Sequence, residues 1–354
     1  MLKILNQLLQ KAPSYIGTIN NNEFILDGKK TLLESALSAG IEIPYNCRVG
    51  SCKKCLCYLK KGEIRSLVDL SYVLSKRELD DNCILACQAI PKSPLEVEVL
   101  SCAEEDFCIE SVICSIDQVS ESVFRIGLEL EKEVGFQFGQ YVNVMLPGKN
   151  IIRSYSVSWP STGRRMVLDV ALRSRGLMSS VLCDRKNMRR KLLVSKPHGS
   201  FGCSLVNDRP LMAIASGSGL GAVLGLVVQF LKRFPQQKVV LFHAVRSIAH
   251  SYDRFRLLQL GNGYEKFRHI VVTSRENVHK PGILPGRLTS YLRDWQFISE
   301  LFETGLPEAK DCNLVLCGSE SLIADCVQVY EDYGVVRNQI DCDVFTSPLA
   351  MAAK

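Results

Sequence analysis

Cysteines with a distinctive spacing are the first residues of the chain that could do chemistry. The stretch "NCRVGSCKKCLC" (46–57) holds four thiols in twelve residues, and Cys87 follows in "ILACQA". The total of fifteen cysteines is odd and the chain start lacks an export signal, so a disulfide framework is disfavoured. Zinc sites usually pair two short Cys-x-x-Cys knuckles, and only one is present here. The spacing Cys47-x4-Cys52-x2-Cys55, with a distant fourth cysteine, is instead typical of a plant-type [2Fe–2S] cluster.

The predicted ligands of this cluster are Cys47, Cys52, Cys55 and Cys87. Gly50 and Ser51 keep bulk away from the loop, so that backbone N–H groups can reach the sulfides. Cys57 and Cys83 are close enough to compete as ligands, and we interpret both as buried bystanders. The segments "TLLESALSAGIEIPYNCRVGSCKKCLCYLKKGEI" and "ILACQAIPKSPLEVEV" resemble the ferredoxin domain fused to bacterial oxygenase reductases. That resemblance implies that Cys47 and Cys52 hold one iron, and Cys55 and Cys87 the other.

Three short motifs mark a second candidate site. They are "FGQYV" (138–142), "RSYS" (153–156) and "GLMS" (176–179), and each alone indicates only a turn, a strand or a helix start. In this order and spacing they resemble the FAD-binding barrel of the ferredoxin–NADP reductase superfamily. The resemblance implies that Arg153 pairs with the FAD diphosphate, Tyr155 stacks on the cofactor and Ser156 bonds toward flavin N5. It also assigns the diphosphate to the helix start formed by Gly176, Leu177, Met178 and Ser179.

A third candidate site begins with "ASGSGLGA" (215–222), which follows a predicted strand and opens a predicted helix. It is not a G-x-G-x-x-G fingerprint, but it resembles the Ala-Gly-Gly-Thr-Gly-Ile-Ala-Pro turn of the same superfamily. The resemblance assigns the cofactor diphosphate to Gly217, Ser218 and Gly219, where glycine permits close backbone approach. "LCGSESL" (316–322) resembles the Cys-Gly-x-x-x-Met motif, which implies that Cys317 lies beside the flavin and the nicotinamide as a shaping group. The alternative for Cys317 is a buried thiol at a strand end.

The choice of nicotinamide depends on charges near the adenine ribose. A 2′-phosphate requires cations and hydroxyls, whereas NAD sites favour a carboxylate. Ser274 and Arg275 in "VVTSREN" come at a predicted strand end, and Arg246 and Arg287 match arginines of bacterial ferredoxin (flavodoxin)–NADP reductases. These four positions favour NADPH, although isolated arginines are usually solvated charges. NADH stays the alternative because many fused oxygenase reductases prefer it.

The elements that must position these residues fall into three segments. Residues 15–103 are predicted to form a small α+β, β-grasp-like ferredoxin domain, with a helix over "TLLESALSAG" capped by Thr31 and Glu34. Residues 108–207 alternate in short runs broken by turns, which predicts an all-β barrel for FAD. Residues 208–345 alternate apolar strands with helical patterns, which predicts a doubly wound α/β domain with a parallel sheet for NAD(P).

The two ends of the chain leave alternatives open. "IDCDVF" (340–345) reads as a plain final strand, or by weak resemblance as a segment in which Asp343 is a polar partner and Phe345 covers the flavin. Apolar residues between 2 and 9 share one helical face, which indicates a helix that packs on the protein or frays. The alternative is a weak contact of this helix with a membrane surface or a partner. The roles of residues 1–14 and 346–354 are not predicted.

The composition excludes several classes of protein. No stretch of eighteen uncharged apolar residues occurs, so no membrane span is predicted. The net charge of +6 is spread along the chain, which does not indicate a nucleic-acid partner. Scattered single cysteines indicate a reduced, cytoplasmic protein, and we expect a monomer.

Three cofactor domains in this order predict an electron-transfer enzyme. NADPH gives two electrons as hydride, a [2Fe–2S] cluster accepts one, and a flavin can do both. The expected acceptor is a redox protein such as an oxygenase, a hydroxylase or a desaturase. The alternatives are a reductase for a soluble carrier or a deoxysugar dehydratase, and a redox sensor without turnover. Near the cluster lie Arg48, Lys53, Lys54, Lys60 and Lys61, either as a solvated surface or as a basic face that docks on an acidic partner.

Overall fold

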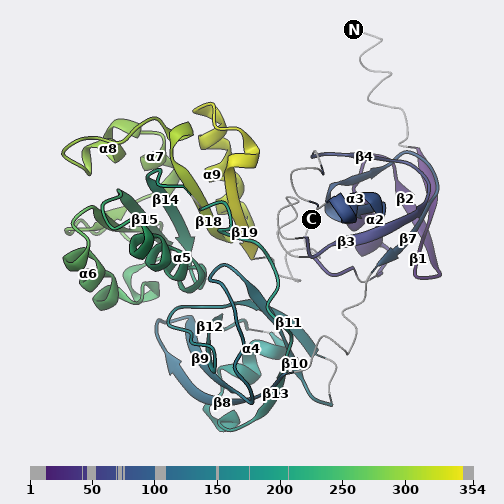
Figure 1. Cartoon of the computed structure of the whole chain (residues 1–354), viewed down its shortest axis with the longest axis horizontal. Helices are drawn as coiled ribbons and strands as arrows, with labels where there is room; N and C mark the ends of the chain where they lie inside the picture. Colours follow the sequence, from purple (N-terminus) through teal and green to yellow (C-terminus); the bar gives the residue numbers. More distant parts are fainter. Residues whose placement is uncertain are drawn as a thin grey trace. The chain divides into compact units, whose positions relative to one another are not determined.

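The chain folds into two compact units, Met1–Ala103 and Glu104–Lys354 (Figure 1). The computed structural model describes residues 13–41, 43–45, 53–68, 70, 74, 76–99, 109–148, 151–174, 176–205 and 207–345. The predicted cluster ligands Cys47 and Cys52 lie outside the described residues, as do the predicted helix near residue 5 and the tail 346–354.

The first unit is built on a mixed five-stranded sheet with the order β2-β1-β7-β3-β5. Strands β1 and β7 are parallel, and the other pairs are antiparallel. This arrangement with a helix packed on it is the predicted β-grasp-like ferredoxin fold. The elements are β1 (Ser14–Ile19), β2 (Asn22–Asp27), α2 (Leu32–Ser38), β3 (Leu56–Lys61), β4 (Ile64–Ser66), α3 (Lys76–Asp80), β5 (Cys83–Leu85), the 3-10 helix η2 (Ala86–Gln88), β6 (Ala89–Pro91) and β7 (Leu95–Val99).

Helix α2 begins where the sequence predicts it. Thr31 is the N-cap, and its Oγ1 accepts a hydrogen bond from the Glu34 backbone N–H at 3.2 Å. The Glu34 carboxylate accepts the Thr31 backbone N–H at 2.8 Å, which completes a capping box. Such a cap stabilises a helix by about 1 kcal/mol. Leu32, Leu33 and Ala36 then face the core of this unit.

The second unit starts with a nearly closed barrel of antiparallel strands. Its order is β11-β10-β13-β8-β9-β12, and every pairing between neighbours is antiparallel. Buried side chains such as Ile113, Ile126 and Leu168 fill its interior. The elements are β8 (Ile109–Gln118), β9 (Val123–Leu130), β10 (Tyr141–Leu146), β11 (Ile151–Ser156), β12 (Arg165–Ala171), α4 (Leu177–Leu182) and β13 (Lys191–Val194).

A parallel six-stranded sheet with the order β17-β16-β15-β14-β18-β19 completes the second unit. All its pairings are parallel, as predicted for a doubly wound domain. The short strand β17 and the helices between β17 and β18 were not predicted individually. The elements are β14 (Leu211–Ser216), α5 (Gly219–Arg233), β15 (Val239–Val245), the 3-10 helix η5 (Ile248–His250), α6 (Arg254–Gly263), β16 (Phe267–Thr273), β17 (Ile283–Pro285), α7 (Leu288–Leu292), α8 (Trp295–Glu300), β18 (Asn313–Ser319), α9 (Glu320–Asp332) and β19 (Ile340–Phe345).

The order in which strands are added to the sheet reverses at β14. Strands β15, β16 and β17 extend the sheet on one side of β14, and β18 and β19 extend it on the other side. Because the strands are parallel and in register, with Ala215 beside both His243 and Cys317, their carboxyl ends meet at one edge. In an open α/β sheet this edge, at the point of reversal, is where ligands bind. The fold therefore places the predicted nucleotide turn, residues 215–222, at the expected position.

Helix α5 joins the sheet to the barrel. It packs on β14, β15 and β18 and also reaches β12 of the barrel. Gly221 and Gly225 lie one turn apart and face the barrel, because a Cβ atom at either position would overlap Asp169 or Phe138 respectively. These two glycines let the helix approach the barrel closely. Among the described residues, no helix has both the length and the apolar character needed to cross a bilayer.

Candidate functional site

Two predicted cluster ligands meet although 31 residues separate them in the chain. The backbone N–H of Cys87, on η2, donates to Sγ of Cys55 at 3.4 Å, and the side chains are 4% and 3% exposed. The Gln88 side-chain amide donates to Sγ of Cys87 at 3.5 Å. Buried thiols that receive N–H donors suit an iron–sulfur cluster, whose potential depends on such hydrogen bonds. The described half of the ligand set therefore fits the group; the other half, Cys47 and Cys52, is outside the described residues.

The two spare cysteines lie on neighbouring strands of the same sheet. Cys57 is fully buried on β3, and its thiol donates to the Ile84 carbonyl at 3.7 Å. Cys83 is buried on β5, opposite Tyr58. Both belong to the hydrophobic core of the first unit. Their role as bystanders stays a prediction.

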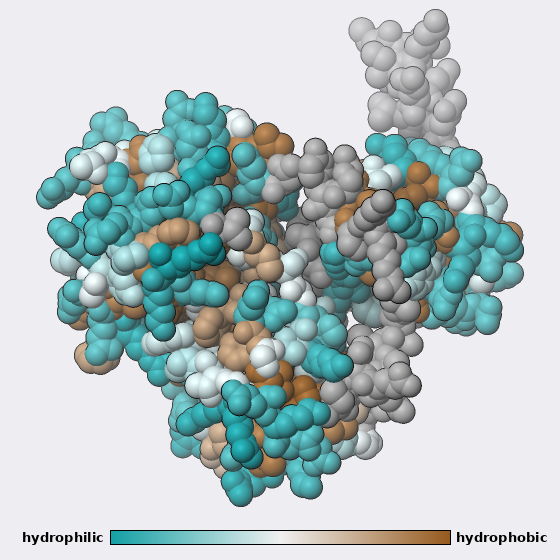
Figure 2. All heavy atoms as spheres, viewed as in Figure 1, coloured by the Kyte–Doolittle hydropathy of each residue, from teal (hydrophilic) through white to brown (hydrophobic). Residues whose placement is uncertain are grey.

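The lysines near the cluster loop do not form a purely basic face. Three of them form ion pairs, at 2.7–2.8 Å, with glutamates of β7 and α3: Lys53 with Glu78, Lys60 with Glu98 and Lys61 with Glu96. The sequence left open a solvated surface or a docking face, and it did not indicate these partners because they come from distant segments. Hydrophilic residues cover much of the visible face of this unit in Figure 2. The surface is polar and mixed in charge.

The edge strand β11 carries the predicted flavin residues. Arg153 is exposed and donates to the Ile152 carbonyl at 2.7 Å, whereas Tyr155 and Ser156 are partly buried. Burial raises the pKa of Tyr155, so its hydroxyl stays protonated as a hydrogen-bond donor. Alternation along the strand places Arg153 and Tyr155 on one face and Ser156 on the other.

Ser156 and Cys317 meet at a carboxylate from the last strand. The Ser156 hydroxyl donates to Asp343 Oδ2 at 2.8 Å, and the Cys317 thiol lies 3.9 Å from the same oxygen. Asp343 is only 4% exposed. Burial, followed by the nearby Asp343 carboxylate, raises the pKa of Cys317 well above its usual value, so the thiol stays neutral. This geometry supports the interpretation of Asp343 as a polar partner, within the final strand β19.

The segment 176–179 opens α4, as its sequence predicts. Gly176 is the N-cap, Met178 and Ser179 are buried, and Leu177 is 62% exposed. The Ser179 hydroxyl accepts a hydrogen bond from the Arg173 backbone N–H at 3.3 Å. The Ser179 side chain thus orders the loop that leads into the helix.

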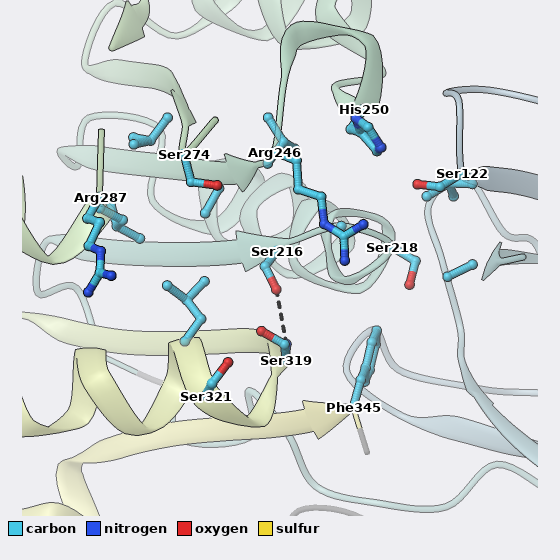
Figure 3. A pocket seen from close by; sticks show the side chains of 18 of the residues that line it. Ser122, Ser216, Ser218, Arg246, His250, Ser274, Arg287, Ser319, Ser321 and Phe345 are labelled. Carbon is cyan, nitrogen blue, oxygen red and sulfur yellow. Dashed lines mark hydrogen bonds between the residues drawn. The ribbon is translucent and has the colours of Figure 1, made fainter. Parts of the chain in front are cut away.

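The nucleotide turn follows β14 directly. Ser218 is the N-cap of α5, and Gly219 stands against β18, where an added Cβ would lie 2.7 Å from the Cys317 carbonyl oxygen. Across the strand ends, the Ser319 backbone N–H donates to Ser216 Oγ at 3.0 Å (Figure 3). Gly318 has φ +145°, and a Cβ there would overlap the Ser216 hydroxyl. The turn and the end of β18 therefore fit together without room for side chains.

A cavity of about 510 Å³ opens at these strand ends. Figure 3 shows Arg246 extending toward Ser218, with Ser274 between Arg246 and Arg287. The cavity brings together five predicted residues: Gly217, Ser218, Arg246, Ser274 and Arg287. Three predicted residues do not line it: Gly219, Arg275 and Cys317. Phe345, which the sequence offered as a flavin cover, also lines this cavity, and its contact with a flavin stays a prediction.

Other residues of the cavity were missed by sequence analysis. Ser122 comes from the turn between β8 and β9, His250 from η5, and Ser319 and Ser321 from the β18–α9 junction. No local motif marks Ser122 or His250, because they reach the cavity from segments that are distant in the chain, whereas Ser319 and Ser321 lie within the motif "LCGSESL" without having been singled out. Serine at a strand end before a helix was the only available signal, as in "CGSES".

Comparisons with known families give the same three parts. Residues 18–92 match the 2Fe-2S iron-sulfur cluster binding domain, residues 111–202 the oxidoreductase FAD-binding domain, and residues 213–328 the oxidoreductase NAD-binding domain. The site geometry above lies within or next to these ranges, with Asp343 beyond the last of them.

Individual proteins resemble the chain over most of its length. The phenol 2-monooxygenase reductase component of Pseudomonas sp. (strain CF600) is 28% identical over 71% of this chain and 73% of its own. A CDP-6-deoxy-L-threo-D-glycero-4-hexulose-3-dehydrase reductase from Yersinia pseudotuberculosis is 23% identical over 91% of this chain and 95% of its own. The crystal structure of an Amycolatopsis cytochrome P450 reductase shares the fold, with a TM-score of 0.62, 24% identity and coverage of 94% of this chain and 99% of that one.

The three matched domains occur in one order, each with the predicted architecture, and the relatives that cover most of the chain are reductases. The chain is a fused [2Fe–2S]/FAD/NAD(P) oxidoreductase of the ferredoxin–NADP reductase superfamily, and its activity is electron transfer.

Proposed function

We propose that this oxidoreductase takes electrons from NADPH and delivers them from its cluster to the oxygenase component of a multicomponent system. The observation that carries the nucleotide preference is the set of arginines on the rim of the cavity. When bound, the nicotinamide supplies a hydride, the flavin accepts it and releases single electrons, and the cluster carries them one at a time.

Positive charge at the cavity favours a phosphate on the adenine ribose. Arg173, Arg246 and Arg287 line the cavity, against one lining carboxylate, Asp325. Arg246 follows β15 and Arg287 follows β17, so the two guanidinium groups come from separate loops that border Ser274. A guanidinium binds a phosphate through two parallel hydrogen bonds, which a ribose diol cannot match.

An NAD site would present a carboxylate in the loop after β16, where the acidic residue is Glu276. The loop after β16 begins with Ser274, Arg275 and Glu276. The Glu276 carboxylate accepts the Ile248 backbone N–H at 2.7 Å, so it already serves a structural hydrogen bond. Arg275 is exposed, and its backbone N–H donates to the Arg246 carbonyl at 2.9 Å, which joins the two arginine loops. We therefore assign the 2′-phosphate to Arg246, Ser274, Arg275 and Arg287.

Steady-state kinetics test the preference. A charge-assisted hydrogen bond contributes about 1.5–3 kcal/mol, so Arg246→Ala or Arg287→Ala should lower kcat/KM for NADPH by about tenfold to a hundredfold. The value for NADH should change little, because NADH lacks the phosphate. Arg233→Ala, on the exposed far end of α5, is the matched control. A wild-type protein that prefers NADH, or arginine variants that affect both nucleotides equally, would refute this assignment.

Ser156, Cys317 and Asp343 lie together at the predicted flavin site. Ser156 donates to Asp343, and the neutral Cys317 thiol points at the same carboxylate. We propose that Ser156 and Cys317 shape the place where the nicotinamide meets the flavin, and that Arg153, Tyr155 and residues 176–179 hold FAD. The cluster ligands are Cys47, Cys52, Cys55 and Cys87. The Ser156→Ala variant should retain FAD, as measured by absorbance, while the reduction of the bound flavin by NADPH becomes slower.

The oxygenase acceptor is proposed from the relatives. The matched phenol 2-monooxygenase reductase component serves an oxygenase, and a dehydrase reductase is also similar, so a deoxysugar dehydratase is the second candidate. Affinity capture with the full-length protein, followed by reduction assays with each captured redox protein, distinguishes the two. Cytochrome c reduction by NADPH tests the sensor alternative, because a sensor would bind its cofactors without turnover. A cytoplasmic monomer without nucleic-acid or membrane partners stays a prediction.

A further inference from the structure

A buried arginine joins the barrel to the nucleotide-binding part of the second unit. Arg125, on β9, is 8% exposed. Its Nε and Nη2 donate to the two oxygens of Asp169, on β12, at 2.8 and 2.9 Å. Its Nη1 and Nη2 donate to the two oxygens of Asp253, before α6, at 2.9 and 2.6 Å. One guanidinium therefore holds a carboxylate from each side through two pairs of hydrogen bonds, the most directional ion pair that proteins form.

The backbone at Asp253 is held in an unusual conformation. Asp253 has φ +55°, in the left-handed region, and it is the N-cap residue of α6 although its side chain caps no N–H group. Its carboxylate instead faces Arg125 and, at 3.4 Å, Arg256. The Arg256 guanidinium lies 5.2 Å from the ring of Trp159 in the barrel. The strained residue is thus fixed by charges from both sides of the boundary.

Tyr252 extends this network to the nucleotide turn. It is 3% exposed, and its hydroxyl donates to Asp169 Oδ2 at 3.0 Å. The same hydroxyl lies 3.4 Å from the carbonyl oxygen of Ser218, the residue that starts α5. The ring of Tyr252 stands edge-on to His243 at 5.5 Å, which limits its rotation. A single buried hydroxyl therefore touches both the barrel carboxylate and the nucleotide turn.

The barrel side of the network reaches the end of the flavin strand. The Asp169 backbone N–H donates to the Ser158 hydroxyl at 3.1 Å, two residues beyond Ser156. The Trp159 backbone N–H donates to the Gly221 carbonyl at 3.2 Å. A Cβ at Gly221 would overlap Asp169 and meet Ser158 Oγ at 2.5 Å. The nucleotide turn and the flavin strand are thus held against the same carboxylate.

We propose that Arg125, Asp169, Tyr252 and Asp253 form a positioning clamp that sets the distance between the nucleotide turn and the flavin strand. The clamp touches neither predicted cofactor site residue at the flavin, Ser156 or Cys317. It acts on hydride transfer through Ser218 on one side and Ser158 on the other. This inference rests on the proposed FAD and nicotinamide sites. A misplacement of about 1 Å between reacting groups can slow a reaction by about a hundredfold, so such a clamp is a control point for rate.

Tyr252→Phe tests the clamp with the least disturbance, because it removes the hydroxyl and keeps the ring. At saturating nucleotide, the rate constant for flavin reduction in anaerobic stopped-flow should fall about tenfold, while the Kd for the oxidised nucleotide changes less than about threefold. Hydrogen–deuterium exchange of the cofactor-loaded protein should quicken in residues 216–222. Asp253→Asn should act in the same direction, because asparagine accepts the left-handed backbone but loses the charge.

Tyr330→Phe is the matched control. Tyr330 is fully buried on α9, and its hydroxyl has no hydrogen-bond partner among the described residues. This variant should keep wild-type reduction and exchange. If Tyr252→Phe matches the control in either measurement, the clamp is refuted. Flavin reduction in the wild-type protein is measured first. If neither NADPH nor NADH reduces the wild-type flavin, the proposed function is refuted instead of the clamp.

Discussion

A buried histidine should make the nucleotide-binding domain sensitive to acid. His243 lies on β15 with no exposed surface, and burial lowers its pKa from 6.5 to about 4, against a smaller opposite effect of the Gly217 backbone. In the unfolded chain the ring takes up a proton below its ordinary pKa of 6.5. The folded domain resists that proton until the pH approaches 4. His243 therefore costs no stability above its unfolded pKa, and stability is lost as the pH falls from 6.5 toward 4.

The magnitude follows from the difference between these pKa values. At pH 5 the unfolded chain gains about 2 kcal/mol from protonating this one ring, and almost nothing at pH 7. Burial also lowers the pKa of His269 to about 3, with smaller effects of His243 and Arg254, so His269 adds to the same trend. Replacing His243 with glutamine removes only the first of these contributions. The free energy of unfolding should therefore drop by about 2 kcal/mol less between pH 7 and pH 5 in His243→Gln than in wild type.

Urea unfolding at the two pH values measures this difference. The only two tryptophans of the chain, Trp159 and Trp295, lie in the second unit, so their fluorescence reports that unit alone. A lower stability of the variant at both pH values does not affect the test, because the comparison uses only the difference in the free energy of unfolding between pH 7 and pH 5. His279→Gln, at an exposed position, is the control and should behave as wild type. Equal pH dependence in wild type and His243→Gln would show that His243 is not buried as a neutral ring.

Two further predictions concern positions where neighbouring atoms set the outcome. Gly318→Ala places a side chain at φ +145° against the Ser216 hydroxyl, so it should destabilise the second unit by about 3 kcal/mol. Gly261→Ala, on helix α6 where a Cβ atom meets no neighbouring atom, should instead stabilise this unit by up to about 1 kcal/mol. Thermal melts compare the two, and equal shifts would contradict the packing at β18. In timed alkylation near neutral pH followed by mass spectrometry, Cys203, which is exposed, should react well before Cys317, which is buried with a raised pKa. Early labelling of Cys317 in the folded protein would contradict its burial.

Local patterns in the sequence predicted the order of the domains, the capping box of α2 and the turn between β14 and α5. These features depend on residues that are close in the chain, such as Thr31 and Glu34, so their spacing carries the information. The cysteine spacing is also local for three of the four proposed ligands, and the fourth was predicted from resemblance to a known pattern.

Contacts between distant segments could not be predicted from spacing. The Lys53–Glu78 pair spans 25 residues, and the Arg125–Asp253 pair spans 128. An isolated lysine or aspartate has the same local pattern whether it is solvated or paired, so the sequence could not indicate these ion pairs. Asp343 was the exception, because weak resemblance indicated a polar partner and the structure places it beside Ser156.

The residues proposed to select the nucleotide differ from the residues at the tightly packed strand ends, which stabilise the domain. The cations proposed to read the 2′-phosphate follow the ends of β15, β16 and β17 in exposed positions. The tight fit lies elsewhere, where Gly219 and Gly318 leave no room for side chains. Substitutions on exposed loops usually change stability by less than about 0.5 kcal/mol. During evolution, a few loop substitutions could therefore change the preference of such a protein between NADPH and NADH, without first requiring compensating changes in the core.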